Sequence, residues 1–119
     1  RFLKKKDPAV QVLAVQPEES PVLTGGGAGP HGIQGIGANF VPKNYDPSVI
    51  DLVLSVSTEE SIEAAKRFMR TEGVLCGISG GAALCGALKY AKTSMKKGLT
   101  IIVILPDTGE RYLSTDLFA

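Results

Sequence analysis

Two short motifs late in the chain hold the residues best suited to chemistry. Residues 77–81 (GISGG) place one hydroxyl at the start of a predicted helix of small residues, and residues 106–109 (PDTG) follow an apolar run. In an open α/β sheet, ligands bind where strands end and helices begin. The two motifs therefore predict part of a cofactor-binding α/β enzyme.

Ser79 is the strongest candidate for a ligand contact. A serine at a helix start normally caps backbone N–H groups two or three residues on, and this purely structural role stays open. Gly80 and Gly81 remove side-chain bulk beside the hydroxyl, so that a planar ring could approach it. A neutral hydroxyl facing a pyridine nitrogen would leave that nitrogen unprotonated. The positive end of the helix reinforces this, because it disfavours a second positive charge.

The segment from Pro106 to Gly109 could wall the same pocket, since it lies just beyond a predicted strand. Asp107 could instead form only an Asx-type turn, which is the commoner use of such a residue. Glu110 and Arg111 could pair with each other or with a neighbouring loop, and we expect them to act as scaffold.

A loop of residues 16–39, rich in glycine and proline, is too long for an idle connection in a compact domain. Such a segment can bring backbone close to a ligand, and it can move. Residues 27–32 match the dinucleotide pattern G-x-G-x-x-G, but they neither follow a strand directly nor open a helix, which argues against that function. His31 could be a general base; a loop histidine bonded to backbone is the favoured interpretation.

The order of predicted elements indicates an α/β fold with strands buried on both faces. Strands are predicted at residues 10–15, 51–56 and 99–105. Residues 1–6 read as the end of a helix, and a second helix begins at Ser57 with an S-x-x-E capping box and ends at Gly73. A third is predicted from Gly80 to Lys92. Its inward face would consist of Ala83, Leu84, Ala87, Leu88 and Ala91.

Composition bounds the remaining possibilities. The chain has 119 residues, 44% of them hydrophobic, and a net charge of +1, which argues against disorder and nucleic-acid binding. Its longest apolar run is too short to cross a membrane. Cys76 and Cys85 fit no zinc pattern and are predicted to be buried free thiols in a reducing compartment. A chain that opens in mid-helix without an initiator Met is expected to be a fragment, cytoplasmic by default, with an organellar form left open.

Three motifs together resemble a known family. Residues 29–38 (GPHGIQGIGA), 77–81 (GISGG) and 109–115 (GERYLST) stand in the order seen in cysteine synthases, the O-acetylserine sulfhydrylases. These are pyridoxal 5'-phosphate enzymes of fold type II, and residues 1–119 resemble their C-terminal third. The resemblance implies a three-layer αβα architecture with a mostly parallel sheet. It also implies conversion of O-acetyl-L-serine and sulfide to L-cysteine and acetate through an α-aminoacrylate intermediate.

The resemblance also assigns roles to residues of this chain. Ser79 would hydrogen-bond the pyridine nitrogen, with Pro106 and Asp107 beside the cofactor. The substrate would be bordered by Gly35, Ile36 and Ala38. The Schiff-base lysine, the loop that grips the substrate carboxylate and the phosphate loop would all lie upstream. The 119 residues alone are therefore predicted to be inactive, and no lysine here takes that role.

Departures from the family pattern leave alternatives open. Gly80 stands where a second serine is more common, and Pro106-Asp107-Thr108 stands where Pro-Ser-Phe is common, so substrate preference is open. Related enzymes include β-cyanoalanine synthase, sulfocysteine synthase and cystathionine β-synthase. A non-catalytic truncated paralogue that binds or dimerises with another protein is a different class of explanation, and a nucleotide-binding half-domain is a third. Implied partners are the rest of the same enzyme, a second copy as a homodimer, and serine acetyltransferase, with neither nucleic acid nor membrane.

Overall fold

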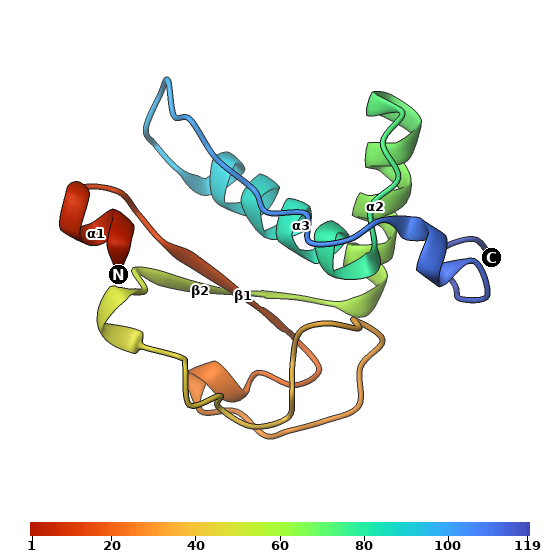
Figure 1. Cartoon of the computed structure of the whole chain (residues 1–119), viewed down its shortest axis with the longest axis horizontal. Coiled ribbons are helices and arrows are strands. Elements are labelled where there is room, and N and C mark those ends of the chain that lie inside the picture. The colour runs from red at the N-terminus through yellow and green to blue at the C-terminus, as the bar shows by residue number, and fades with distance from the viewer.

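The computed structural model describes residues 1–119 as an α/β fold (Figure 1). Its helices and strands, in chain order, are α1 (Phe2–Lys6), β1 (Leu13–Pro17), β2 (Leu52–Val56), α2 (Thr58–Glu72) and α3 (Ile78–Thr93). Short 3-10 turns lie at Val22–Thr24, Pro47–Val49 and Gly109–Tyr112. In Figure 1, α2 and α3 lie on one side of the two strands and the long connection between β1 and β2 lies on the other. The predicted α/β class is confirmed.

The sheet consists of β1 and β2, which pair in parallel with Leu13 opposite Leu52 and Pro17 opposite Val56. Burial increases along both strands: Leu52 is 43% exposed, whereas Pro17 and Val56 are fully buried. The carboxyl ends of the strands therefore point into the interior. The first two predicted strands are confirmed, although β1 begins three residues later than expected.

The third predicted strand, residues 99–105, is wrong for this chain. The segment is extended but pairs with no strand, and Ile102 and Ile104 are 83% and 73% exposed. A strand needs a neighbour for its N–H and C=O groups, and no strand of these 119 residues lies beside it. Only alternate side chains, Val103 and Leu105, are half-buried. The apolar run therefore predicted an extended segment correctly and its pairing wrongly.

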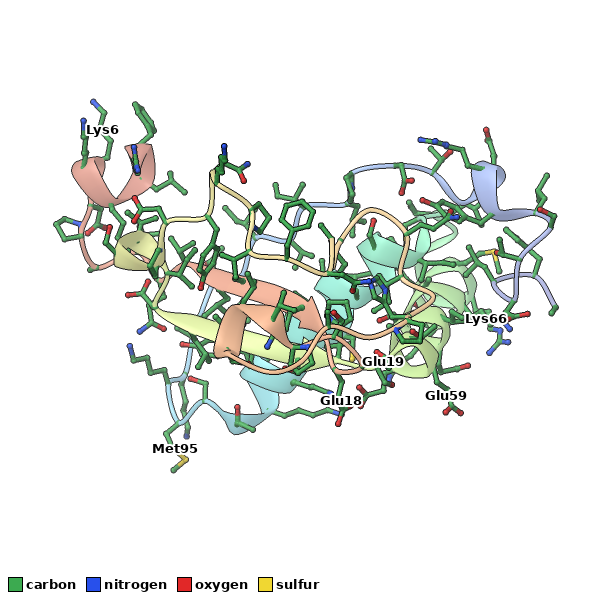
Figure 2. All side chains as sticks on the ribbon, turned by 90° about the horizontal axis from the view of Figure 1, so that it is seen from below. Lys6, Glu18, Glu19, Glu59, Lys66 and Met95 are labelled. Carbon is green, nitrogen blue, oxygen red and sulfur yellow. The ribbon has the colours of Figure 1, made fainter.

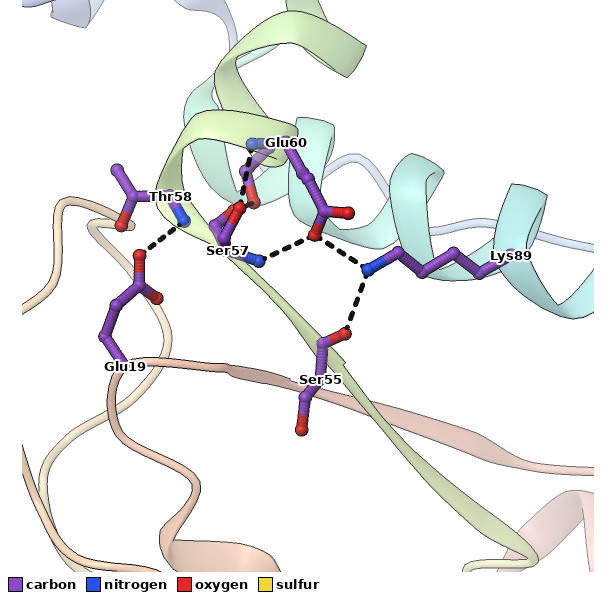
Figure 3. Close-up of polar contacts among 7 residues, drawn as sticks. Glu19, Ser55, Ser57, Thr58, Glu60 and Lys89 are labelled. Atoms are coloured by element: carbon purple, nitrogen blue, oxygen red, sulfur yellow. Dashed lines mark hydrogen bonds and ion pairs between the residues drawn. The ribbon is translucent and has the colours of Figure 1, made fainter.

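Local signals set the limits of α2. The Ser57 hydroxyl accepts from the Glu60 N–H at 3.1 Å, and the Glu60 carboxylate accepts from the Ser57 N–H at 2.9 Å, so the predicted capping box is confirmed. Gly73 ends the helix with φ +68°. On α3, the Lys89 ammonium donates to Glu60 at 2.7 Å and to the Ser55 carbonyl at 3.3 Å (Figure 3). The hydrogen bond from Lys89 and that from the Ser57 N–H together lower the pKa of Glu60. The ion pair thus joins α3 to α2, and the second hydrogen bond of Lys89 joins α3 to β2.

Helix α3 begins two residues before the predicted start, with Gly77 as its N-cap. The predicted inward face is confirmed only in part: Ala83, Leu84 and Ala87 are half-buried, whereas Leu88 is 46% exposed and Ala91 is also exposed. Apart from Ile78, the residues that α3 buries are small: Ser79, Gly80, Gly81, Ala82 and Gly86.

Close approach explains why α3 buries its small residues. A Cβ on Gly81 would lie 2.1 Å from the Ser61 carbonyl oxygen of α2, and one on Gly86 would lie 2.9 Å from a methyl group of Val15 on β1. Any larger side chain at either position would push the helix off its neighbours. Glycine therefore sets the distance of α3 from both α2 and the sheet.

The core collects side chains from most of the chain. The eight buried hydrophobic residues are Ile33, Val56, Ala65, Cys76, Ile78, Ala82, Tyr112 and Leu117. Around them, Glu18, Glu59 and Met95 project outward, Met95 being 97% exposed (Figure 2). None of the helices is long and apolar enough to cross a membrane.

Candidate active site

Ser79 is the second residue of α3 and is only 6% exposed. Gly77 holds the cap position, the helix has no side-chain cap bond, and the Ser79 hydroxyl has no hydrogen-bond partner within the chain. The capping role left open by the sequence is therefore wrong. The residue is largely buried, but its hydroxyl oxygen is not among the fully enclosed, unpartnered atoms of the chain, so it remains accessible to a ligand.

Gly35 lies directly against Ser79, although 44 positions separate them in the sequence. Its φ is +102°, a backbone conformation that favours glycine, and a Cβ placed on it would lie 3.4 Å from the Ser79 hydroxyl oxygen. The structure thus brings together the predicted nitrogen-binding residue and one predicted substrate residue. Of the other two, Ile36 packs against the hydrophobic core and Ala38 is exposed.

The segment around Asp107 runs antiparallel to the residues that precede α3. The Gly77 N–H donates to the Asp107 carbonyl at 3.3 Å, and the Gly109 N–H donates to the Leu75 carbonyl at 3.4 Å. An isolated bridge between Cys76 and Thr108 lies between these two bonds. This pairing places Asp107 beside Gly77, the residue that caps α3 and that precedes Ser79 by two positions.

The two carboxylate oxygens of Asp107 have different surroundings. Oδ2 accepts from the Tyr112 hydroxyl at 2.5 Å, whereas Oδ1 is buried and has no hydrogen-bond partner. Oδ1 lies so close to Gly77 that a Cβ there would be 2.1 Å from it. The positive end of α3 favours a carboxylate at this place. The predicted Asx-type turn is absent, because the Asp107 side chain accepts from no backbone N–H.

Tyr112 is a residue that the sequence reasoning missed. It is 5% exposed, and the hydrogen bond to Asp107 together with burial raises its pKa. A buried tyrosine hydroxyl usually has a partner, so Asp107, five residues earlier, was a detectable candidate. Pro106, by contrast, is exposed, and Glu110 and Arg111 form no ion pair with each other.

The two glycines after Ser79 do not serve the purpose predicted for them. A Cβ on Gly80 would lie 3.2 Å from the Cβ of Cys76, and a Cβ on Gly81 would meet the Ser61 carbonyl. Both glycines therefore face protein neighbours rather than a space beside the Ser79 hydroxyl. Their small size serves packing of α3.

Predictions about the other titratable residues are mostly confirmed. His31 bonds to backbone at both ring nitrogens, and residues 27–32 form no helix, as expected for a loop that is not a dinucleotide site. Cys76 and Cys85 are free thiols whose pKa values are raised by burial, although Cys85 is only half-buried. No group of three or more histidine, cysteine, aspartate or glutamate side chains could hold a metal ion.

Comparison with known families decides the class to which this site belongs. The family model described as pyridoxal-phosphate dependent enzyme matches residues 1–107. The chain belongs to this family. Its members depend on pyridoxal phosphate, which agrees with the cofactor implied by the motifs.

Individual relatives narrow the class. The chain is 43% identical over 119 residues to the cysteine synthase of Staphylococcus aureus, matching 100% of this chain and 38% of the relative. The crystal structure of O-acetyl serine sulfhydrylase isoform 3 from Entamoeba histolytica superposes with a TM-score of 0.95 at 49% identity, over 98% of this chain and 35% of that one. An O-acetylserine dependent cystathionine beta-synthase from Helicobacter pylori superposes with a TM-score of 0.91 at 38% identity, over 100% of this chain and 38% of that one. The resemblance to cysteine synthases and the fold type II architecture are thereby confirmed. The chain spans little more than a third of the length of these relatives.

Proposed function

We propose that residues 1–119 form the part of a cysteine synthase that binds the pyridine nitrogen of pyridoxal phosphate and lines the substrate side of the active site. The complete enzyme would convert O-acetyl-L-serine and sulfide to L-cysteine and acetate. The observation that carries the proposal is the Ser79 hydroxyl, which has no partner in the chain, lies on a largely buried residue and faces Gly35. The cysteine synthase relative from Staphylococcus aureus supports the choice of reaction.

The donors and acceptors of the site fit this cofactor. Ser79 offers a hydroxyl that can donate to a ring nitrogen, and Asp107 Oδ1 offers an acceptor that no group of the chain uses. Bound pyridoxal phosphate supplies the electron sink for reactions at the α- and β-carbons of an amino acid. The chain's own contribution is to bind the ring, set the charge near its nitrogen and line the substrate with backbone.

Ser79 sets that charge. A serine hydroxyl gives up its proton far less readily than a carboxylic acid, so it hydrogen-bonds a ring nitrogen while leaving the nitrogen neutral. The positive end of the α3 dipole, where Ser79 lies, also disfavours a positive charge there, an effect that the nearby Asp107 carboxylate reduces. A neutral nitrogen weakens the electron sink, which favours loss of a β-substituent over transamination.

The lysine that holds the cofactor would lie in the part of the enzyme outside these residues. Within residues 1–119, Lys89 is half-buried, and its hydrogen bond to Glu60 raises its pKa. A nucleophilic amine needs a lowered pKa. Lys66 bonds the carbonyl of Ala119, and Lys43 is exposed.

The proposal is tested on the product of the complete natural reading frame that contains these residues. The wild-type protein is expected to bind pyridoxal phosphate with a visible absorption band, to change that band on addition of O-acetyl-L-serine, and to release L-cysteine when sulfide is present. Ser79→Asp can hold a protonated nitrogen, so it should keep the band but lose about 100-fold in cysteine formation. Gly80→Ala, at the next position but facing Cys76, serves as the matched control.

Three results would contradict the proposal. The first is a wild-type protein that binds no cofactor, the result that a non-catalytic protein-binding paralogue would give. The second is release of no cysteine by a wild-type protein that does bind the cofactor. The third is a Ser79→Asp protein as active as the Gly80→Ala control.

A further inference from the structure

We propose that His31 is a positioning residue for the substrate side of the site, because its imidazole holds the turn of residues 33–37 closed and thereby keeps Gly35 against Ser79. The inference rests on the proposed function only in treating Gly35 as a residue of the substrate side. The contacts of His31 are independent of that function.

The imidazole bridges the two ends of this turn. Its Nδ1 accepts from the Ile33 N–H at 3.1 Å, and its Nε2 lies 2.7 Å from the Gly37 carbonyl oxygen. Because Nδ1 accepts, the neutral ring carries its proton on Nε2, which donates to Gly37. Both nitrogens are therefore engaged with backbone, and His31 has no free nitrogen with which to act as a general base.

The two ends of the turn differ in how far they depend on His31. At the entry, Ile33 is fully buried in the core and the neighbouring Gly32 N–H donates to the Thr58 hydroxyl at 2.9 Å. At the return, the backbone of Gly37 is in the left-handed region with φ +66°, and its carbonyl is held by the imidazole. The entry is thus anchored to the core and to α2 without the histidine side chain. The return is held by the imidazole together with Ile36, which packs against the core, and Asn39, which accepts from the buried Ser20 hydroxyl at 2.7 Å.

Gly35 lies between these ends and faces Ser79. Its φ of +102° makes the turn tight, and a Cβ placed on it would be in ordinary van der Waals contact with the Ser79 hydroxyl oxygen, at 3.4 Å. If the bond to Gly37 is lost, only the packing of Ile36 and the bond at Asn39 still hold the return, so the backbone between them can shift while the entry stays in place. Gly35 would then leave Ser79, and the backbone that faces the substrate would lose its fixed position.

Two substitutions in the complete natural protein separate positioning from folding. His31→Leu removes both hydrogen bonds. His31→Asn keeps an acceptor for the Ile33 N–H, as asparagine does in Asx turns, but is too short to reach Gly37. Ala28→Ser, at an exposed position of the same long loop, is the matched control.

The expected kinetic result is a split between KM and kcat. One neutral hydrogen bond contributes a factor of roughly 2 to 10 to an equilibrium, so His31→Leu should raise KM for O-acetyl-L-serine about tenfold and leave kcat within about threefold. The visible band of the bound cofactor should be unchanged, because Ser79 is intact. His31→Asn should lie between His31→Leu and the wild type.

A second measurement tests the turn without any reaction. Amide hydrogen exchange of residues 33–37 in substrate-free protein should be faster in His31→Leu, less so in His31→Asn, and unchanged in Ala28→Ser. If the wild-type protein forms no cysteine, the proposed function fails, yet exchange still decides the role of His31. Unchanged exchange and unchanged KM in His31→Leu would overturn the inference. If His31→Leu does not fold, His31→Asn decides: wild-type exchange and KM in that variant would overturn it as well.

Discussion

Replacing Gly81 by alanine is expected to destabilise the protein and to loosen the site at the same time. In α3, the new methyl group would lie 2.1 Å from the Ser61 carbonyl oxygen, 2.9 Å from the Ala65 Cβ and 3.1 Å from the Ala65 nitrogen. Two of these three atoms belong to the backbone of α2, so no rotation of a side chain can relieve the contact. The two helices must move apart by roughly 1.5 to 2 Å along this contact to restore ordinary contact distances of about 3.5 to 4 Å.

The magnitude follows from two opposing effects. Overpacking of a well-packed interface typically costs about 1–3 kcal/mol, and a backbone obstacle puts Gly81→Ala near the upper end. Replacing a helical glycine by alanine returns about 1 kcal/mol through helix propensity. The net expectation is a loss of about 2 kcal/mol in the free energy of unfolding, which raises the unfolded fraction by a factor of roughly 30.

Urea denaturation of the complete natural protein, followed by far-ultraviolet circular dichroism, measures this loss. The matched control is Gly80→Ala, one position earlier in the same helix, where the new methyl group would lie 3.2 Å from the Cys76 Cβ and 3.4 Å from a Leu105 methyl group. That variant should stay within about 1 kcal/mol of the wild type. Because the helix that moves carries Ser79, Gly81→Ala should also retain less cofactor. Equal stability of the two variants would refute the argument that glycine sets the distance between α2 and α3.

Three further changes test other contacts. Tyr112→Phe leaves the carboxylate of Asp107 without its only partner and should cost about 1–3 kcal/mol in urea denaturation. The pKa of Tyr112 is raised from 10.0 in the folded state, so the stability of the wild-type protein should be full below that pH and fall as the pH rises above it. The Tyr112→Phe variant should lack this fall. Glu60→Gln keeps an acceptor for the capping box but loses the ion pair with Lys89, which should lower the free energy of unfolding by less than about 1 kcal/mol. Because the pKa of Glu60 is lowered from 4.5, the stabilising contribution of its carboxylate is lost as pH falls below that value, and the variant should lose less stability in acid than the wild type. An identical acid profile would count against the pairing. The Cys76 thiol, buried and with a pKa raised chiefly by burial, should react with iodoacetamide far more slowly in native than in denatured protein, as followed by mass spectrometry, and equal rates would contradict its burial.

The parts of the fold that were predictable from sequence depend on contacts between near neighbours. Ser57 and Glu60 form the capping box at the start of α2, and Gly73 ends the helix. These signals act on the adjacent helical turn, so the residue types alone were sufficient to predict both ends of α2. The strand predicted at residues 99–105 depends instead on a partner elsewhere, and apolar composition carries no information about which segment supplies it. The buried face of α3 was misjudged for a related reason, since helical periodicity ranks large residues above the glycines at which α2 and β1 approach.

The candidate site divides in the same way. Ser79 could be selected from its place at a helix start, and the bonds of His31 to backbone were expected of a loop histidine. The contact of Gly35 with Ser79 spans 44 positions and could be anticipated only from the resemblance to cysteine synthases. The bond between Asp107 and Tyr112 was missed because Asp107 was considered only as a cofactor contact or a turn residue, although a buried tyrosine hydroxyl five residues away requires a partner.

The charges around the start of α3 support the assignment of Ser79 to a ring nitrogen rather than to the cofactor's phosphate. A helix N-terminus is ordinarily a good site for a phosphate group, because its free N–H groups and its dipole attract anions. Here the carboxylate of Asp107 already lies beside Gly77, the residue that caps α3. A phosphate at the same place would be repelled by that carboxylate, whereas a neutral ring nitrogen that accepts from a hydroxyl would not. The N-terminus of α3 is therefore better suited to the ring than to the phosphate.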